Sequence, residues 1–137
     1  MRAGLFALVT MLGALVPVPA GAADYPMCSA ELRTRCIVDG DTFRYRGARV
    51  RISNIDAPET HSPTCPEERA RGEAAALRLG QLLGAGHWRL RRAPGEADRD
   101  LHGRLLRIVV AGDTDIGDVL IAEGLARAWT GRRQPWC

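Results

Sequence analysis

Lysine is absent from the sequence: all 19 basic residues are arginine, and with 16 acidic residues they give the 137-residue chain a net charge of +3. So small an excess of positive charge does not by itself indicate a nucleic-acid partner. The exclusive use of arginine has a chemical consequence, because a planar guanidinium can donate two parallel hydrogen bonds to one phosphate group.

Long apolar stretches are also lacking, apart from Leu5–Val16 near the start. This run is too short to span a bilayer as a helix. It follows a single arginine and precedes the small residues 20–22, which is the layout of a secretory signal peptide. A buried N-terminal helix is disfavoured because the run has no polar spacing. We therefore expect residues 1–22 to be a signal peptide and residues 23–137 to form one secreted or periplasmic domain, monomeric and not membrane-bound.

Cysteine is scarce, and its four residues lie at positions 28, 36, 65 and 137. An even number in a small exported domain indicates two disulfide bonds, and four cysteines allow three pairings. The sequence alone does not choose among them. We favour Cys28–Cys36, which closes a short loop, and Cys65–Cys137, which holds the C-terminus to the domain. A zinc site that includes His61 is disfavoured because the chain has no CxxC or HxxxH pair.

Alternating apolar and polar residues predict a series of short strands. The predicted strands are 36–38, 42–46, 48–55, 87–92 and 103–111, with a last extended piece at 125–129. In the third of these the alternation fails at Ser53-Asn54, which predicts a bulge that redirects Asp56.

Two helices are predicted between these strands. The first follows a T-x-x-E capping box that starts at Thr64 and runs to about Leu83. Its apolar side is expected at Ala70, Ala74 and Leu77. The second covers 116–123 behind the cap residue Asp115. This order predicts an α+β fold with a mainly antiparallel sheet, and a five-stranded Greek-key β-barrel with two helices, as in the OB-fold, fits it.

Acidic residues stand at strand ends on both sides of an arginine-rich hairpin. Asp39 and Asp41 precede the hairpin, and Asp56 and Glu59 follow it. A hairpin can bring its two strand ends side by side, so Asp41 and Asp56 would converge on a site for a hard cation such as calcium. The alternative is turn chemistry, because Asp-Gly is common in turns.

Two arginines favour the site over the turn. Arg51 lies five residues before Asp56, and Arg104 begins a later strand. A cation and two arginines around one point would stabilise the charge that develops on a phosphodiester during its hydrolysis. A neighbouring carboxylate such as Glu59 would orient or deprotonate the attacking water.

Three ordered motifs connect these residues. The first is Val38-Asp39-Gly40-Asp41-Thr42, the second is Arg51 followed by Asp56-Ala57-Pro58-Glu59, and the third is Asp100-Leu101-His102-Gly103-Arg104. With these motifs the chain resembles the staphylococcal nuclease (thermonuclease) family over roughly residues 36–129. The resemblance implies the OB-fold and a calcium-dependent endonuclease that hydrolyses DNA or RNA at the P–O5′ bond and leaves 3′-phosphates.

The same resemblance implies roles for individual residues. Calcium would be held by the carboxylates of Asp41 and Asp56 and by the backbone carbonyl of Ala57. Catalysis would fall to Glu59, as the base or the group that positions water, and to Arg51 and Arg104, which would grip the phosphate. Substrate bases would stack near His102 and Trp129.

The chain departs from the family pattern at its end, where the long C-terminal helix of the family is missing. We expect the disulfide through Cys137 to hold the terminus in its place. Two other functions remain as alternatives: a non-catalytic nucleic-acid-binding module on the same fold, and a small disulfide-bonded structural protein whose acidic turns have no chemical role.

Overall fold

The computed structural model describes residues 25–137, so the expected signal peptide at 1–22 lies outside the described residues. The helices are α1 (Pro66–Gly84) and α2 (Ile116–Ala122). The strands are β1 (Cys36–Asp39), β2 (Thr42–Tyr45), β3 (Ala48–Ile52), β4 (Ile55–Asp56), β5 (Trp88–Arg91), β6 (Leu105–Ala111), β7 (Thr114–Asp115) and β8 (Arg127–Ala128). No helix between residues 25 and 137 is long and apolar enough to cross a membrane.

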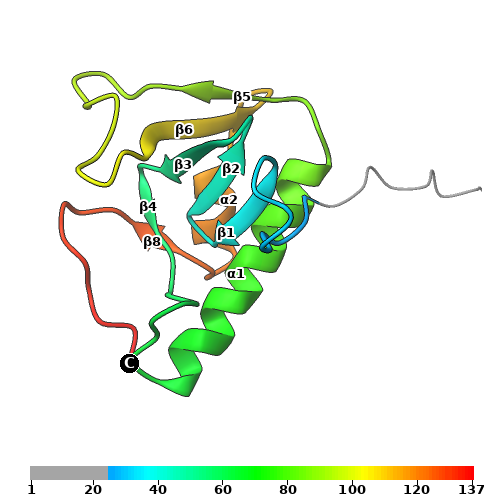
Figure 1. Cartoon of the computed structure of the whole chain (residues 1–137). Helices are drawn as coiled ribbons and strands as arrows, with labels where there is room; N and C mark the ends of the chain where they lie inside the picture. The colour runs from blue at the N-terminus through cyan, green and yellow to red at the C-terminus, as the bar shows by residue number, and fades with distance from the viewer. Residues whose placement is uncertain (1–24) are drawn as a thin grey trace, which may run out of the picture.

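The main sheet has the order β1-β2-β3-β6-β5, with β7 paired to β6, and β4 and β8 form a separate pair (Figure 1). The β3–β6 pairing is parallel and the others are antiparallel. The predicted α+β class with two helices is confirmed, and the arrangement is consistent with the OB-fold. The sheet is not closed among the described residues, because β1 and β5 end the strand order without pairing to each other.

The predicted single strand 48–55 is two strands. The chain turns at Ser53-Asn54, and β4 leaves the main sheet to pair with β8. Asn54 explains the break, because its carbonyl accepts the backbone N–H of Trp129 at 2.9 Å and its side-chain amide donates to Asp115 at 2.9 Å. A turn therefore stands where a bulge was expected, and it ties β4 to the C-terminal part of the chain.

The buried face of α1 is not the predicted one. Ala70, Ala74 and Leu77 are exposed, Leu77 by 60%. The face against the sheet contains Gly72, Ala75, Ala76, Leu79, Gly80 and Leu83. A β-carbon at Gly72 would lie 2.7 Å from the carbonyl oxygen of Pro58, and one at Gly80 would lie 2.7 Å from that of Tyr25. The helix therefore packs backbone against backbone, and a pattern search for large apolar residues misses such a face.

The core lies between α1 and the sheet. Phe43, Val50, Ile52 and Leu79 are fully buried in it. The rings of Tyr25, Phe43 and Trp88 meet edge to face, with 5.7 Å between the centroids of Phe43 and Trp88. Such contacts add to the burial of apolar area.

Two disulfide bonds hold the ends of the described chain, and they are the pairs favoured from the sequence. Cys28–Cys36 fastens the N-terminal segment to β1. Cys65–Cys137 joins residues 72 positions apart and brings the irregular tail to the first turn of α1 (Figure 1). The chain from residue 123 to residue 137 contains no helix.

Gly72→Ala tests the close contact of α1 with the Pro58-Glu59 backbone. Alanine favours a helix by about 1 kcal/mol over glycine, but its β-carbon would lie 2.7 Å and 2.9 Å from two carbonyl oxygens. We expect a net loss of about 1–3 kcal/mol in the free energy of unfolding, measured by urea denaturation. Ala74→Ser, which adds one atom on the exposed side, should change it by less than about 0.5 kcal/mol. A stabilised Gly72→Ala protein would show that the two segments are not in contact.

Candidate active site

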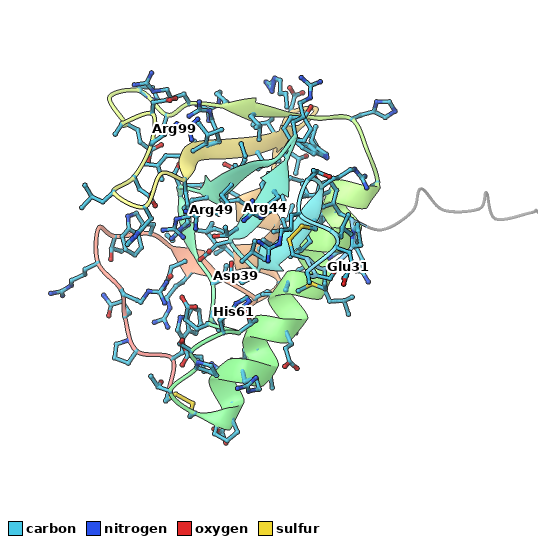
Figure 2. All side chains as sticks on the ribbon, in the orientation of Figure 1. Glu31, Asp39, Arg44, Arg49, His61 and Arg99 are labelled. Atoms are coloured by element: carbon cyan, nitrogen blue, oxygen red, sulfur yellow. A yellow bond between two sulfur atoms is a disulfide. The ribbon has the colours of Figure 1, made fainter. Side chains whose placement is uncertain are left out.

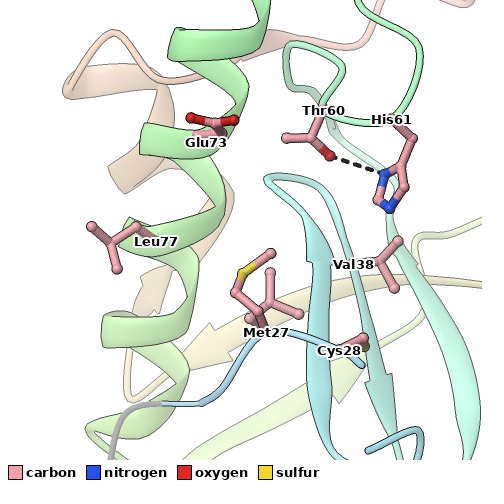
Figure 3. Close-up of a pocket in the computed structure, with 8 residues that line it drawn as sticks. Met27, Cys28, Val38, Thr60, His61, Glu73 and Leu77 are labelled. Carbon is pink, nitrogen blue, oxygen red and sulfur yellow. Dashed lines mark hydrogen bonds between the residues drawn. The ribbon is translucent and has the colours of Figure 1, made fainter. Parts of the chain in front are cut away.

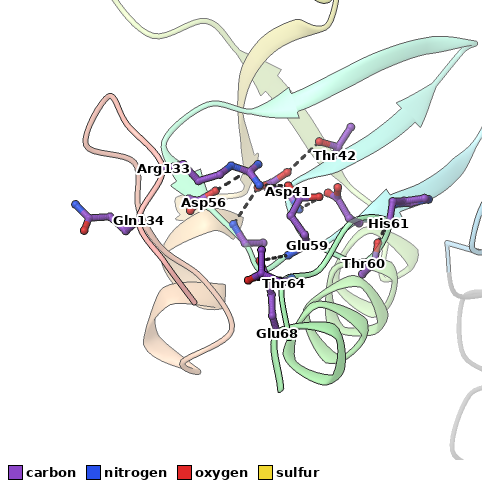
Figure 4. A network of polar contacts seen from close by, with 12 residues as sticks. Asp41, Thr42, Asp56, Glu59, Thr60, His61, Thr64, Glu68, Arg133 and Gln134 are labelled. Atoms are coloured by element: carbon purple, nitrogen blue, oxygen red, sulfur yellow. Dashed lines mark hydrogen bonds and ion pairs between the residues drawn. The ribbon is translucent and has the colours of Figure 1, made fainter. Parts of the chain in front are cut away.

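The carboxylate of Asp41 joins the turn after β1 to the loop after β4. It is buried, and its Oδ2 accepts the backbone N–H of Ala57 at 2.9 Å (Figure 4). The hydroxyl of Thr42 donates to its Oδ1 at 3.0 Å, and Nη2 of Arg51 lies 3.7 Å from its Oδ2. The antiparallel register pairs Thr42 with Arg51, which explains why these two ends meet.

Asp56 lies beside this group, so the structure brings together the two aspartates expected to converge. Its side chain is buried, and neither carboxylate oxygen has a hydrogen-bond partner. Burial raises the pKa of Asp56, and the nearby Asp41 carboxylate raises it further. The nearest cationic partner of Asp56 is Nη2 of Arg133, 3.9 Å from Oδ1. A buried carboxylate that is so weakly paired is costly, and a bound cation would offset that cost.

Asp39 supports the same turn from behind. Its Oδ1 accepts the backbone N–H of Asp41 at 3.1 Å. Burial raises the pKa of Asp39 to about 8, and the adjacent Asp41 carboxylate adds to the effect. Asp39 therefore holds its proton more tightly than an exposed aspartate does.

Arg51 and Arg104 line one cleft of about 550 Å³. The parallel pairing of β3 with β6 sets Val50 opposite Leu105, so Arg51 on β3 and Arg104 just before β6 lie near each other. Arg51 is buried rather than solvated, and it donates to the carbonyls of Ile52 and Ile55. Its guanidinium is therefore fixed in orientation before any ligand arrives.

Arg104 is oriented by Asp100, four residues before it. Its Nε and its backbone N–H donate to the two oxygens of Asp100, at 2.7 Å and 2.9 Å. Partial burial would raise the pKa of Asp100, but the hydrogen bonds from the backbone and side chain of Arg104 outweigh it and lower that pKa. Asp100 stays ionised and holds Arg104 within 3.5 Å of the Thr42 hydroxyl.

The two residues expected to stack substrate bases lie on the wall of this cleft. Trp129 is 39% exposed, and its ring centroid is 5.6 Å from the guanidinium carbon of Arg51. His102 is exposed, and its carbonyl accepts a hydrogen bond from Arg49 at 2.6 Å. Arg44 and Arg49 lie directly opposite each other on β2 and β3 (Figure 2), outside the cleft lining.

Glu59 is paired with a residue that the sequence interpretation did not single out. Its Oε1 accepts a hydrogen bond from Nη1 of Arg133, and Nη2 of Arg133 lies 3.9 Å from Oδ1 of Asp56 (Figure 4). Arg133 also lines the cleft. Its tail segment has no periodic pattern, so the only sequence signal was the expected disulfide at Cys137.

Glu68 is a second residue that was missed. The capping box was expected to use Thr64 and Glu67, but the N-cap of α1 is Cys65 and the capping acid is Glu68. The buried Glu68 carboxylate accepts the N–H and hydroxyl of Thr64 at 2.6 Å and 2.8 Å, and the N–H of Glu59 at 3.4 Å. The helix begins one residue later than the T-x-x-E pattern indicates, with Pro66 in its first turn. Glu68 thereby fixes the backbone of Glu59.

The residues present fit a hard divalent cation in part. Asp41 and Asp56 offer carboxylate oxygens, and both oxygens of Asp56 lack a hydrogen-bond partner within residues 25–137. No group of three or more histidine, cysteine, aspartate or glutamate side chains gathers as a metal cage in residues 25–137. Backbone carbonyls, such as that of Ala57, and water would have to complete the shell of six to eight oxygens that calcium takes.

A second cavity, of about 360 Å³, lies between α1 and β1 (Figure 3). Its lining is mostly apolar and includes Met27, Val38 and Leu77, and its one histidine, His61, is hydrogen-bonded to the Thr60 hydroxyl at 3.0 Å. The zinc alternative is wrong, because Cys65 is bonded to Cys137 and cannot join His61 as a ligand.

Buried carboxylates thus lie beside two arginines at one cleft of an α+β fold. Residues 49–135 match the family model described as staphylococcal nuclease homologue. The chain therefore belongs to the staphylococcal nuclease homologue family. Asp41 lies before the matched span, whereas Arg51, Asp56, Glu59 and Arg104 lie within it.

Three curated proteins are similar to the chain. Endonuclease YncB of Bacillus subtilis (strain 168) is 37% identical over 95 residues, 66% of this chain and 44% of that protein. The SPbeta prophage-derived endonuclease YokF of the same strain is 39% identical over 95 residues, 66% of this chain and 31% of that protein. Thermonuclease of Staphylococcus intermedius is 34% identical over 96 residues, 67% of this chain and 55% of that protein. The match thus spans between about a third and about half of each relative's length.

Glu68→Gln tests the hydrogen bonds that fix the Glu59 loop. The hydrogen bond from the Thr64 N–H lowers the pKa of Glu68 below its usual value of 4.5. Its stabilisation is therefore complete above that value and is lost as the pH falls through the lower pKa of the folded state. We expect the variant to lose about 1–3 kcal/mol of unfolding free energy at pH 7, and the difference from the original protein to shrink in acid.

The matched control is Glu67→Gln, since Glu67 is the exposed neighbour in the same first turn. Its stability should stay within about 0.5 kcal/mol of the original. Denaturant unfolding followed at several pH values measures both variants. Equal losses of unfolding free energy in the two variants would contradict the role of Glu68 and favour the capping box predicted with Glu67.

Proposed function

We propose that the protein is a calcium-dependent nuclease that hydrolyses phosphodiester bonds of DNA or RNA. The observation that carries the proposal is the buried carboxylate of Asp56, which accepts no hydrogen bond within residues 25–137 and lies beside Asp41, next to a cleft lined by Arg51 and Arg104. Negative groups that need a cation and positive groups that suit a phosphate adjoin each other here. The family and the names of the relatives support the same activity.

Calcium would be held by Asp41, Asp56 and the carbonyl of Ala57, and when bound it supplies positive charge that polarises the phosphate. Glu59 is proposed to orient the attacking water and accept its proton. Arg51 and Arg104 are proposed to donate to the phosphate oxygens, on which negative charge grows. Both are already fixed by protein partners, so they need little reorganisation during the reaction.

The reaction that we propose breaks the P–O5′ bond. The water oxygen forms a new bond to phosphorus, Glu59 accepts a water proton, and the departing 5′ oxygen takes a proton from solvent. The products are a 3′-phosphate and a 5′-hydroxyl. His102 and Trp129 present rings at the cleft wall, where stacking can hold bases of either nucleic acid.

We also propose that the protein is exported and acts as a monomer. The sequence of residues 1–22 supports export, as do the two disulfide bonds, which persist in oxidising compartments.

The central test is nuclease activity on DNA and on RNA, with calcium and with a chelator. We expect calcium to support cleavage and the chelator to abolish it. Glu59→Gln should lower kcat by about 100-fold to 10,000-fold, because the water loses its proton acceptor, while the melting temperature stays close to that of the original protein. Glu73→Gln, on the exposed side of α1, is the matched control and should remain fully active.

Two results would contradict the proposal. Oligonucleotide binding without chelator-sensitive cleavage would identify a nucleic-acid-binding module. If the protein neither binds oligonucleotide nor is stabilised by calcium, the structural-protein alternative holds. Mapping the product ends, by testing whether a kinase can phosphorylate the 5′-hydroxyls, checks the bond that is broken.

A further inference from the structure

We propose that Arg133 is a third phosphate-binding arginine of the cleft, and that the Cys65–Cys137 disulfide positions it there. The inference rests on the nuclease function proposed above and adds a substrate-positioning residue to it. It assigns a role to the C-terminal tail, which the proposed chemistry does not otherwise use.

Arg133 lies where the cleft and the acidic cluster meet. It lines the same cleft as Arg51 and Arg104. Its Nη1 donates to Glu59, and its Nη2 faces Asp56 at 3.9 Å (Figure 4). The side chain remains 50% exposed. It is therefore held beside the group proposed to handle water and is still accessible to a ligand in the cleft.

The three arginines differ in how their donors are used. Arg51 is buried and bonded to two carbonyls, and Arg104 is bonded to Asp100. Arg133 has one hydrogen bond, to Glu59, among the contacts of residues 25–137. A guanidinium has five N–H donors, so Arg133 can keep Glu59 and still donate to a phosphate. This would place a backbone phosphate directly beside Glu59.

The tail that carries Arg133 is held at both ends. Before it, the N–H of Trp129 donates to Asn54 at 2.9 Å. After it, Nη2 of Arg127 donates to the carbonyl of Pro135 at 2.8 Å, and the Arg127 guanidinium lies 3.5 Å from the ring centroid of Trp136. Cys137 then completes the attachment through its disulfide to the N-cap of α1.

The disulfide determines where the tail can go. Its partner Cys65 is six residues after Glu59, and Thr64 between them contacts both Glu68 and the sulfur of Cys137. The segment 129–137 has no helix or strand to direct it. A covalent link at this point therefore brings Arg133 to the Glu59 loop.

The first test compares Arg133→Gln with Arg132→Gln in binding of a fluorescent single-stranded oligonucleotide, with chelator present so that no cleavage occurs. Arg132 is exposed, makes no ion pair or hydrogen bond within residues 25–137, and lies outside the cleft lining. Both variants remove one positive charge from the same tail. We expect Arg133→Gln to weaken binding roughly tenfold and to reduce the slope of log K against log salt by about 0.7. Arg132→Gln should do neither, and Arg133→Lys should regain part of the affinity.

The second test is a thermodynamic cycle with the disulfide. Replacing both Cys65 and Cys137 with serine should weaken binding about as much as Arg133→Gln, and adding Arg133→Gln to that protein should then cost little more. If the serine protein does not fold, Cys137→Ala with and without Arg133→Gln gives the comparison and leaves the Cys28–Cys36 bond intact. Fully additive losses would overturn the role of the disulfide.

Equal binding by the Arg133→Gln and Arg132→Gln proteins would overturn the role of Arg133. In calcium, the proposal expects KM to rise in Arg133→Gln by a larger factor than kcat falls; a fall in kcat alone would overturn substrate positioning. Failure of this inference can be distinguished from failure of the nuclease proposal, because the first is measured by binding and the second by cleavage. A protein that cleaves nothing but whose binding depends on Arg133 would refute the nuclease and support this inference.

Discussion

The site depends on one buried carboxylate, that of Asp41. It accepts the N–H of Ala57 and lies against Arg51, so the turn after β1, strand β3 and the loop after β4 are joined at one point. The preceding Gly40 leaves no room for a side chain, because a β-carbon there would lie 2.6 Å from that of Ala75 on α1. Removing the carboxylate would leave buried partners unsatisfied, so the same interaction orders the fold and the site.

Among the arginines of the hairpin, the one that contacts Asp41 is buried and the others stay near the surface. Arg51 is drawn into the structure by a carboxylate and two carbonyls, whereas Arg44 and Arg49, directly opposite each other, stay at the surface. Asp56 remains the one member of the cluster whose oxygens have no hydrogen-bond partner within residues 25–137. The site is thus largely preorganised, and Asp56 is the carboxylate whose oxygens are left for the proposed cation.

Short-range sequence patterns predicted most of the secondary structure and part of the site. The strands, the two helices and the convergence of Asp41 with Asp56 follow from alternation, from cap residues and from motif spacing. The buried face of α1 did not follow, since glycine contributes to it by having no side chain, and hydrophobic periodicity cannot register that. Glu68 was missed because the helix begins one residue later than the T-x-x-E pattern indicates. Arg133 was missed because its partner Glu59 is 74 residues away and no periodic element carries it.

The tail shows how a chain can position a residue without regular structure. An isolated irregular segment would lose about 1–2 kcal/mol per residue in backbone entropy on becoming fixed. A disulfide across 72 residues restricts the unfolded chain instead, and is worth about 4 kcal/mol on the loop-entropy estimate. The Arg127 contacts with Pro135 and Trp136 then limit the remaining freedom. On the proposal that the disulfide positions Arg133, the geometry beside Glu59 is coupled to a covalent bond that reduction can break.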